Sequence, residues 1–137
     1  MAKFSIGQKD SFSKTLTARE VDAFAEISGD MNPVHLDDEY AKQTRFGKRI
    51  AHGALTASLI STIIGTKLPG VGSIYMSQST KWIKPVFLGD TITALVEITA
   101  IRADKGIVTL KTDCVNQNGD KVVEGEAVVF HPDAKTQ

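Results

Sequence analysis

Residues 50–65 read Ile-Ala-His-Gly-Ala-Leu-Thr-Ala-Ser-Leu-Ile-Ser-Thr-Ile-Ile-Gly, the most apolar long segment of the chain, and they include no charged side chain. Leucine and isoleucine recur there at helical spacing, and alanine, serine and threonine fill the other faces. A helix that is small or apolar on every face is expected to be buried all round. About fourteen residues make a helix of roughly 21 Å, which is too short to cross a bilayer. The segment therefore predicts a central core helix that other elements wrap.

The composition fits one globular domain over residues 1–137, with 42% hydrophobic and 23% charged residues. Lys plus Arg and Asp plus Glu each number 16, and this zero net charge argues against binding to nucleic acid or to an anionic membrane. Zero net charge also favours association into an oligomer. The single cysteine, Cys114, precludes an internal disulfide, and the first residues lack an apolar signal segment. We therefore expect a cytoplasmic location.

Two helices are expected before the central one. Residues 17–20, Thr-Ala-Arg-Glu, form a capping-box pattern, and Gly29 is a suitable stop for the helix that follows. One face of this helix carries apolar or small residues at i, i+3, i+4 and i+7: Val21, Phe24, Ala25 and Ser28. Pro33 disfavours helical geometry in the residue before it, so residues 30–35 are expected to form an extended turn. Residues 37–43 are expected to form the second, shorter helix.

The second half of the chain has the texture of strands. Four strands are expected in antiparallel succession, over residues 74–83, 91–102, 107–115 and 121–130. Turn signals separate them, the strongest being Asn118-Gly119. Residues 4–15 suit a loop and a short edge strand, and residues 131–137 a frayed tail. The pattern predicts an α+β domain with a meandering antiparallel sheet and one helix lying on it.

Asp30 and His35 are the first candidates for catalysis. Pro33 lies between them, and a turn at this position can fold the carboxylate and the imidazole toward one point. Such a pair can hold a water molecule, with one group taking a proton and the other delivering one. The alternative is an Asx-turn at Asp30 and a hydrogen-bonded histidine near a helix start. On these two residues alone, that alternative is favoured.

The flanking sequence changes this balance. Residues 24–41, Phe-Ala-Glu-Ile-Ser-Gly-Asp-Met-Asn-Pro-Val-His-Leu-Asp-Asp-Glu-Tyr-Ala, resemble the hydratase-2 motif of the MaoC-like family, the (R)-specific enoyl-CoA hydratases. Residues 50–53 resemble the family's entry into its central helix, and residues 85–90 and 125–127 resemble its sheet segments. The similarity covers nearly the whole chain, and no position of the motif departs from it.

The resemblance implies a hot-dog fold, an antiparallel β-sheet wrapped around a long central helix, in a homodimer. It also implies reversible addition of water to trans-2-enoyl-CoA, giving (R)-3-hydroxyacyl-CoA, for polyhydroxyalkanoate supply or fatty-acid oxidation. In this family Asp30 and His35 would activate the water, and the Gly53 amide would bind the thioester carbonyl. Asn32 would orient the site, and Ser61 would give a supporting hydrogen bond. No metal or organic cofactor is implied, because the substrate itself carries coenzyme A.

Elementary chemistry supports the role of Gly53. Hydration of an unsaturated thioester builds negative charge on its carbonyl oxygen, and backbone N–H groups at a helix N-terminus can stabilise that charge. Glycine lets the thioester approach the backbone closely. The alternative for Gly53 is close packing of the helix on a strand.

The remaining candidate site residues are expected to have structural roles, or have two alternative interpretations. His52 is expected to be a helix cap or a buried, hydrogen-bonded residue, and His131 a surface residue. Three histidines without Cys or Glu at ligand spacing predict no metal site. Bulky aromatic residues are expected in the core or an interface: Phe46, Trp82 and Phe87. Three basic residues could meet the phosphates of coenzyme A or be solvated loop charges: Arg45, Lys48 and Arg49.

Four alternative functions are considered, and two of them are disfavoured. Hot-dog thioesterases and acyl-carrier-protein dehydratases commonly carry an acid on the central helix, and residues 53–66 have none, which disfavours both. A MaoC-like dehydratase acting on an acyl-carrier-protein or on branched or dicarboxylic acyl-CoA is not disfavoured. A non-catalytic acyl-CoA binding protein would not need both Asp30 and His35.

Overall fold

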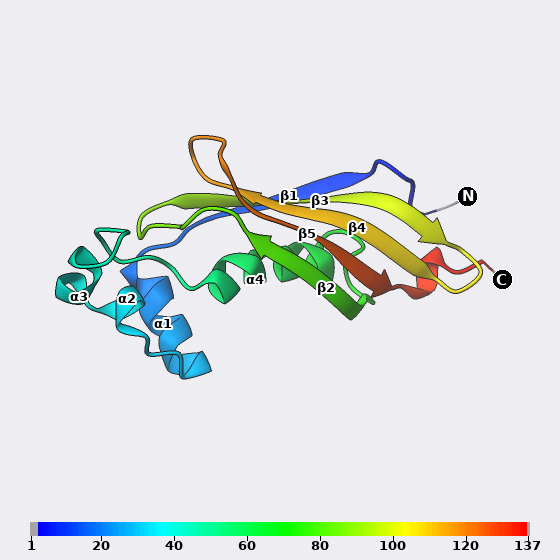
Figure 1. The fold of residues 1–137 in the computed structure, drawn as a ribbon. Coiled ribbons are helices and arrows are strands. Elements are labelled where there is room, and N and C mark those ends of the chain that lie inside the picture. Colours follow the sequence, from blue (N-terminus) through cyan, green and yellow to red (C-terminus); the bar gives the residue numbers. More distant parts are fainter. Residues whose placement is uncertain (1–2, 137) are drawn as a thin grey trace.

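The computed structural model describes residues 3–136. A five-stranded sheet forms one layer, helix α4 lies along one of its faces, and three shorter helices gather at one end (Figure 1). The elements in chain order are β1 (Lys9–Thr15), α1 (Ala18–Ser28), α2 (Pro33–Leu36), α3 (Asp38–Lys42), α4 (Gly53–Thr66), β2 (Ile74–Trp82), β3 (Thr91–Arg102), β4 (Ile107–Val115), β5 (Lys121–Phe130) and a 3₁₀ turn, η1 (Pro132–Ala134). This architecture confirms the predicted hot-dog fold.

All strand pairs are antiparallel, in the order β1-β3-β4-β5-β2. Strands β3, β4 and β5 form the expected meander, and β1 is the expected edge strand. Strand β2 differs from a simple succession, because it pairs with β5 instead of β3, for example Gln78 opposite Ala127. The chain therefore crosses the sheet between Trp82 and Thr91. This crossing leaves the far side of β2 as a free edge within the described part of the chain.

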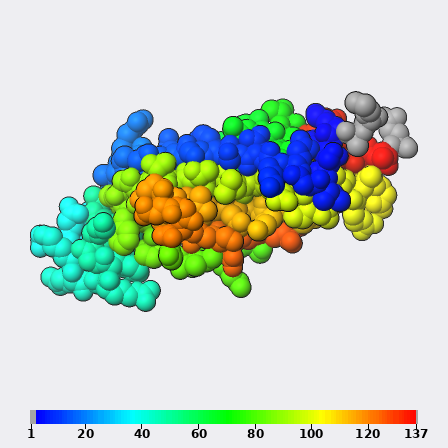
Figure 2. Space-filling view, turned by 90° about the horizontal axis from the view of Figure 1, so that it is seen from above, coloured from blue at the N-terminus to red at the C-terminus, as the bar shows by residue number. Residues whose placement is uncertain are grey.

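Helix α4 supplies the centre of the hydrophobic core. Leu59, Ile60, Ile63 and Ile64 are buried and pack with inward-facing residues of the sheet, such as Leu110. The prediction that α4 is buried on every face is wrong for the single chain. A stripe of small residues remains exposed on it: Ala54, Ser58, Ser61 and Gly65. On the opposite side of the sheet, strand β1 and strands β3 to β5 form the molecular surface (Figure 2).

The helices before α4 largely follow the local sequence signals. The Thr17 amide and hydroxyl both donate to Glu20 Oε1, and Gly29 ends α1 with a φ of 80°. The expected extended turn at 30–35 is wrong in its second half, because residues from Pro33 form the single-turn helix α2. Proline suits the first position of a helix, where its missing N–H is not needed. The Asn32 side chain caps this turn by accepting a hydrogen bond from the Val34 amide.

The C-terminal segment is ordered where a frayed tail was expected. The prediction that His131 lies on the surface is wrong, because this residue is buried. Its Nε2 donates to the Val71 carbonyl, and its Nδ1 accepts from the Asp133 amide. Its ring also contacts Phe4 edge-on. Turn η1 follows directly, and Gln137 lies outside the described residues. Within residues 3–136, each helix is too short or too polar to span a membrane.

Candidate active site

Four predicted or considered site residues come together where the short helices meet α4. Asp30 lies in the loop after α1, His35 lies on α2, and His52 and Gly53 begin α4. The donor atoms of Asp30, His35 and His52 all lie within 4.8 Å of one another. The fold therefore gathers the carboxylate and the imidazole in one place, as the turn around Pro33 was expected to do.

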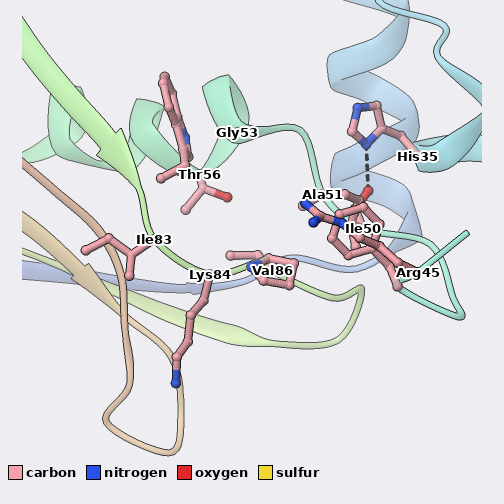
Figure 3. Close-up of a pocket in the computed structure, with 12 residues that line it drawn as sticks. His35, Arg45, Ile50, Ala51, Gly53, Thr56, Ile83, Lys84 and Val86 are labelled. Atoms are coloured by element: carbon pink, nitrogen blue, oxygen red, sulfur yellow. Dashed lines mark hydrogen bonds between the residues drawn. The ribbon is translucent and has the colours of Figure 1, made fainter.

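The hydrogen bonding of His35 defines its protonation state. Its Nδ1 lies 2.8 Å from the Ile50 carbonyl oxygen (dashed in Figure 3), and a carbonyl can only accept, so the proton is on Nδ1. The Nε2 lone pair is then free in the neutral ring. Burial, together with the neighbouring His52, lowers the pKa of His35 below its ordinary value of 6.5, against opposing effects of Ile50 and Asp30. His35 is therefore a neutral imidazole at pH 7, able to accept a proton.

His52 is a buried, hydrogen-bonded residue, as expected. Only 2% of it is exposed, and its Nε2 donates to the Asp30 carbonyl oxygen at 3.0 Å. Its ring stacks on that of His35, with centroids 3.9 Å apart, and also contacts Phe24 of α1. Its Nδ1 is buried and has no hydrogen-bond partner within residues 3–136. His52 thus contacts both candidate catalytic residues.

Gly53 is the first residue of α4, where backbone N–H groups lack partners within the helix. The His52 side chain does not cap this turn, and the first turn has no acidic residue to neutralise the helix dipole. The packing alternative considered for Gly53 also finds support at this position. A Cβ on Gly53 would lie 2.7 Å from Trp82 Nε1, so packing against β2 also demands glycine.

A cavity of about 270 Å³ opens beside these groups. His35, Gly53 and Thr56 line it, and Ile83, Lys84 and Val86 lie across from Gly53 and Thr56 (Figure 3). Trp82 and Pro85, from the same segment as Ile83, also line it. Its remaining lining residues are Arg45, Phe46, Ile50 and Ala51. The sequence interpretation did not identify residues 82–86 as a wall, and it assigned Trp82 and Phe46 to the core or an interface. The alternating pattern that ends near Ile83, followed by Pro85, marks where the strand ends, but it carries no signal that this segment reaches α4.

The two predicted substrate-binding residues lie outside the lining of this cavity. Asn32 uses its side-chain oxygen to cap α2, the helix that carries His35. Ser61 lies on the exposed stripe of α4. The three basic residues before α4 have separate surroundings: Arg45 lines the cavity, Lys48 lies over the Phe87 ring, and Arg49 bonds to His35 and Asp22.

Within residues 3–136, the cluster of Asp30, His35 and His52 is the group whose donor atoms could hold a metal ion. The spacing of histidines in the sequence gave no sign of this cluster. A metal ion lies in the plane of each imidazole that binds it, whereas the rings of His35 and His52 are stacked with only 29° between their planes. This arrangement suits proton transfer better than metal ligation.

Comparisons with known proteins agree with the fold. Residues 3–119 match the family described as "MaoC like domain". The chain is 52% identical over 127 residues to the (R)-specific enoyl-CoA hydratase of Aeromonas caviae, covering 93% of this chain and 95% of that protein. It is 37% identical over 123 residues to a mitochondrial 3-hydroxyacyl-[acyl-carrier-protein] dehydratase of Arabidopsis thaliana, covering 88% and 73%.

Solved structures of (R)-hydratases are also similar to this chain. The (R)-hydratase from A. caviae involved in PHA biosynthesis superimposes with a TM-score of 0.93 at 50% identity, covering 96% of this chain and all of that one. An unliganded (R)-hydratase from Pseudomonas aeruginosa gives a TM-score of 0.91 at 43% identity, covering 96% and 84%. From the hydratase-2 motif, the fold and these relatives together, the chain belongs to the MaoC-like family.

Proposed function

We propose that this protein is an (R)-specific enoyl-CoA hydratase, which adds water to trans-2-enoyl-CoA to give (R)-3-hydroxyacyl-CoA. One observation carries the proposal: a neutral imidazole and a helix N-terminus face the same cavity, through His35 and Gly53. The relative of this name from A. caviae supports the choice of reaction and substrate. The absence of a carboxylate from α4 supports it over the reactions of other hot-dog enzymes.

The proton transfers are assigned to His35 and Asp30. The free Nε2 of His35 accepts a proton from water as the water oxygen bonds to the β-carbon of the enoyl group. The Asp30 side chain lies on the exposed side of the cluster, where it holds the same water and passes the proton that Nε2 has taken up on to the α-carbon, so that His35 ends neutral again. The atoms of one water molecule are then shared between the two carbons. A positioned acid or base contributes about 10²–10⁴ to such a rate.

The Gly53 amide is assigned to the thioester carbonyl. Negative charge develops on that oxygen during the addition, and the uncapped N-terminus of α4 is suited to stabilise it. Asn32 is assigned to holding α2 and His35, and Ser61 to a supporting hydrogen bond across a dimer. No metal or organic cofactor is required by this mechanism.

The working form is proposed to be a cytoplasmic homodimer. Strand β2 has a free edge and exposed apolar residues, including Met76 (56% exposed) and Trp82 (54%), within the described residues. The exposed small-residue stripe of α4 would allow a second helix to approach closely. Because Trp82 lines the catalytic cavity, a second copy on β2 would also shield the site from water.

The experiment that tests this function is hydration of crotonyl-CoA, followed as loss of the absorbance of the conjugated thioester, with chiral analysis of the product. We expect the (R) isomer, and an (S) product would overturn the proposal. Asp30→Ala and His35→Ala should each nearly abolish the reaction while circular dichroism stays unchanged. Full activity in either variant would refute its assigned role.

A second candidate is the reverse reaction on an acyl-carrier-protein thioester, which the A. thaliana relative favours. The same residues would serve, since hydration and dehydration share one transition state. Comparing kcat/KM for 3-hydroxybutyryl-CoA with that for the same acyl group on acyl-carrier-protein separates the two. We expect the coenzyme A ester to be the better substrate.

A further inference from the structure

Arg49 makes contacts that the sequence did not predict. Its side chain is only 14% exposed, although it lies in the loop between α3 and α4. Its Nε donates to the His35 carbonyl oxygen at 2.6 Å, and one terminal nitrogen donates to Asp22 Oδ1 at 2.9 Å. One guanidinium thus joins the residue proposed as the base to helix α1.

The need for such a contact follows from the weakness of α2. This helix has four residues, none of them buried, and a helix of one turn is not stable by itself. Its position therefore depends on bonds to its surroundings. The residue after Arg49 makes two of them, because the Ile50 amide donates to the Val34 carbonyl and the Ile50 carbonyl accepts from His35 Nδ1.

The hydrogen bond from Arg49 adds a third contact between α2 and its surroundings, and this one is made to the backbone of His35. The Ile50 contacts hold the ring and the preceding peptide, whereas Arg49 holds the carbonyl of His35. Arginine suits the task because its planar fork presents donors in fixed directions, so one side chain can bond to a carbonyl and to a carboxylate at once. Asp22 fixes the guanidinium from α1, whose residue Phe24 also supports His52.

We propose that Arg49, held by Asp22, is a positioning residue that fixes the imidazole of His35 for proton transfer. The inference rests on the proposed function only in naming the reaction whose rate should respond. Loss of Arg49 should affect the orientation of the base more than the binding of the thioester. It should therefore lower kcat and leave KM nearly unchanged.

The test compares Arg49→Ala, Arg49→Lys, Asp22→Ala and Asp22→Asn with Lys42→Ala, a control that removes a surface ion pair on α3. We expect kcat to fall at least about tenfold in Arg49→Ala, with KM within about twofold, since a misplaced catalytic group costs up to about 10²-fold. Arg49→Lys should recover little, because an ammonium lacks the planar fork. Asp22→Asn should recover most of what Asp22→Ala loses, because it keeps an acceptor oxygen. The control should match the wild type.

Two further readouts separate positioning from general damage. The acid limb of the pH profile should move to higher pH in Arg49→Ala, because a loosened His35 is more hydrated, whereas mere loss of folded protein would leave the limb in place. The ¹H–¹⁵N spectrum of the His35 ring should show the Nδ1–H form in the wild type and a mixture of tautomers in the variant. This spectrum needs no activity, so it tests Arg49 even if the wild type hydrates no enoyl-CoA. An unchanged ring spectrum in all folded Arg49 variants, or an unchanged kcat in an active enzyme, would overturn the proposal.

Discussion

The imidazole rings of His35 and His52 stack on each other, with centroids 3.9 Å apart and planes inclined by 29°. A proton on one ring disfavours a proton on the other, because two like charges at this distance repel. The Nε2 of His52 donates to the Asp30 carbonyl oxygen at 3.0 Å, which fixes the second ring in the stack. The stack therefore helps to keep His35 in the form that accepts a proton.

The first prediction concerns pH. Since burial lowers the pKa of His35 below 6.5, the acid limb of kcat/KM for crotonyl-CoA should have its midpoint below that value. In His52→Gln, which keeps a donor for the Asp30 carbonyl, the midpoint should rise toward 6.5. The same shift makes the folded state less stable as the pH falls below about 6.5, because the unfolded chain binds the proton more readily. A midpoint at or above 6.5 in the wild type would contradict the assignment of His35 as base.

The second prediction concerns the start of α4. In Gly53→Ala the new methyl group would lie 2.7 Å from Trp82 Nε1 and would displace either the indole or the first turn of the helix. If the first turn moves, we expect kcat to fall by about 10²–10³-fold, the effect of losing one oxyanion donor. The double variant Gly53→Ala/Trp82→Phe should regain part of this loss, since the smaller ring leaves space. Wild-type kcat in the single variant would show that the indole gives way instead of the first turn of α4, and that its displacement does not affect the reaction.

The third prediction concerns the free edge of β2. Met76→Arg places a charge on the proposed dimer face, so light scattering after gel filtration should show a shift from dimer toward monomer, with loss of activity. Leu95→Arg, on β3 and also exposed, is the matched control and should remain dimeric. A wild-type protein that is monomeric at micromolar concentration would contradict the proposed assembly.

The fourth prediction concerns Arg45, which lines the cavity and whose guanidinium lies over the ring of Phe46. Arg45→Ala should raise KM for crotonyl-CoA several-fold, because a cation near the site attracts the phosphates of the carrier. The short N-acetylcysteamine thioester has no phosphate, so its kcat/KM should change little. Arg19→Ala, an exposed cation on α1, serves as the control for net charge. Equal losses on both thioesters would show that Arg45 shapes the cavity wall instead.

The fifth prediction concerns Cys114. Burial raises the pKa of its thiol to about 12, and its Sγ faces the Thr56 carbonyl oxygen at 3.9 Å. Since the thiolate is the reactive form, the native protein should resist a thiol reagent at pH 8, and the unfolded protein should react fully. Rapid labelling of the native protein would indicate that the core opens around β4.

Local patterns predicted most of the elements and the candidate site. The ends of helices and strands were predictable where residues close in sequence determine them, as at Thr17, Gly29 and the Asn-Gly turn. The motif around Pro33 likewise predicted that Asp30 lies near His35. The pairing of β2 with β5 could not be predicted. The alternation of polar and apolar residues indicates that a segment is a strand, but it does not indicate which strand pairs with it. The same holds for Arg49, His131 and Trp82, whose partners lie far away in sequence. The surroundings of these side chains depend on how segments distant in sequence pack together. The hydropathy of a residue type gives only its average tendency to be buried.

The residues that line the cavity come from different parts of the chain, and under the proposed function this arrangement would separate catalysis from selectivity. His35 and Gly53 belong to segments tied together by hydrogen bonds before β2 begins, whereas Ile83 and Pro85 lie in the crossing between β2 and β3. Substitutions in that crossing can widen or narrow the space for an acyl group without moving a proton-transfer group. Related enzymes could therefore change their acyl-thioester preference through single substitutions in this segment, while they keep the same reaction.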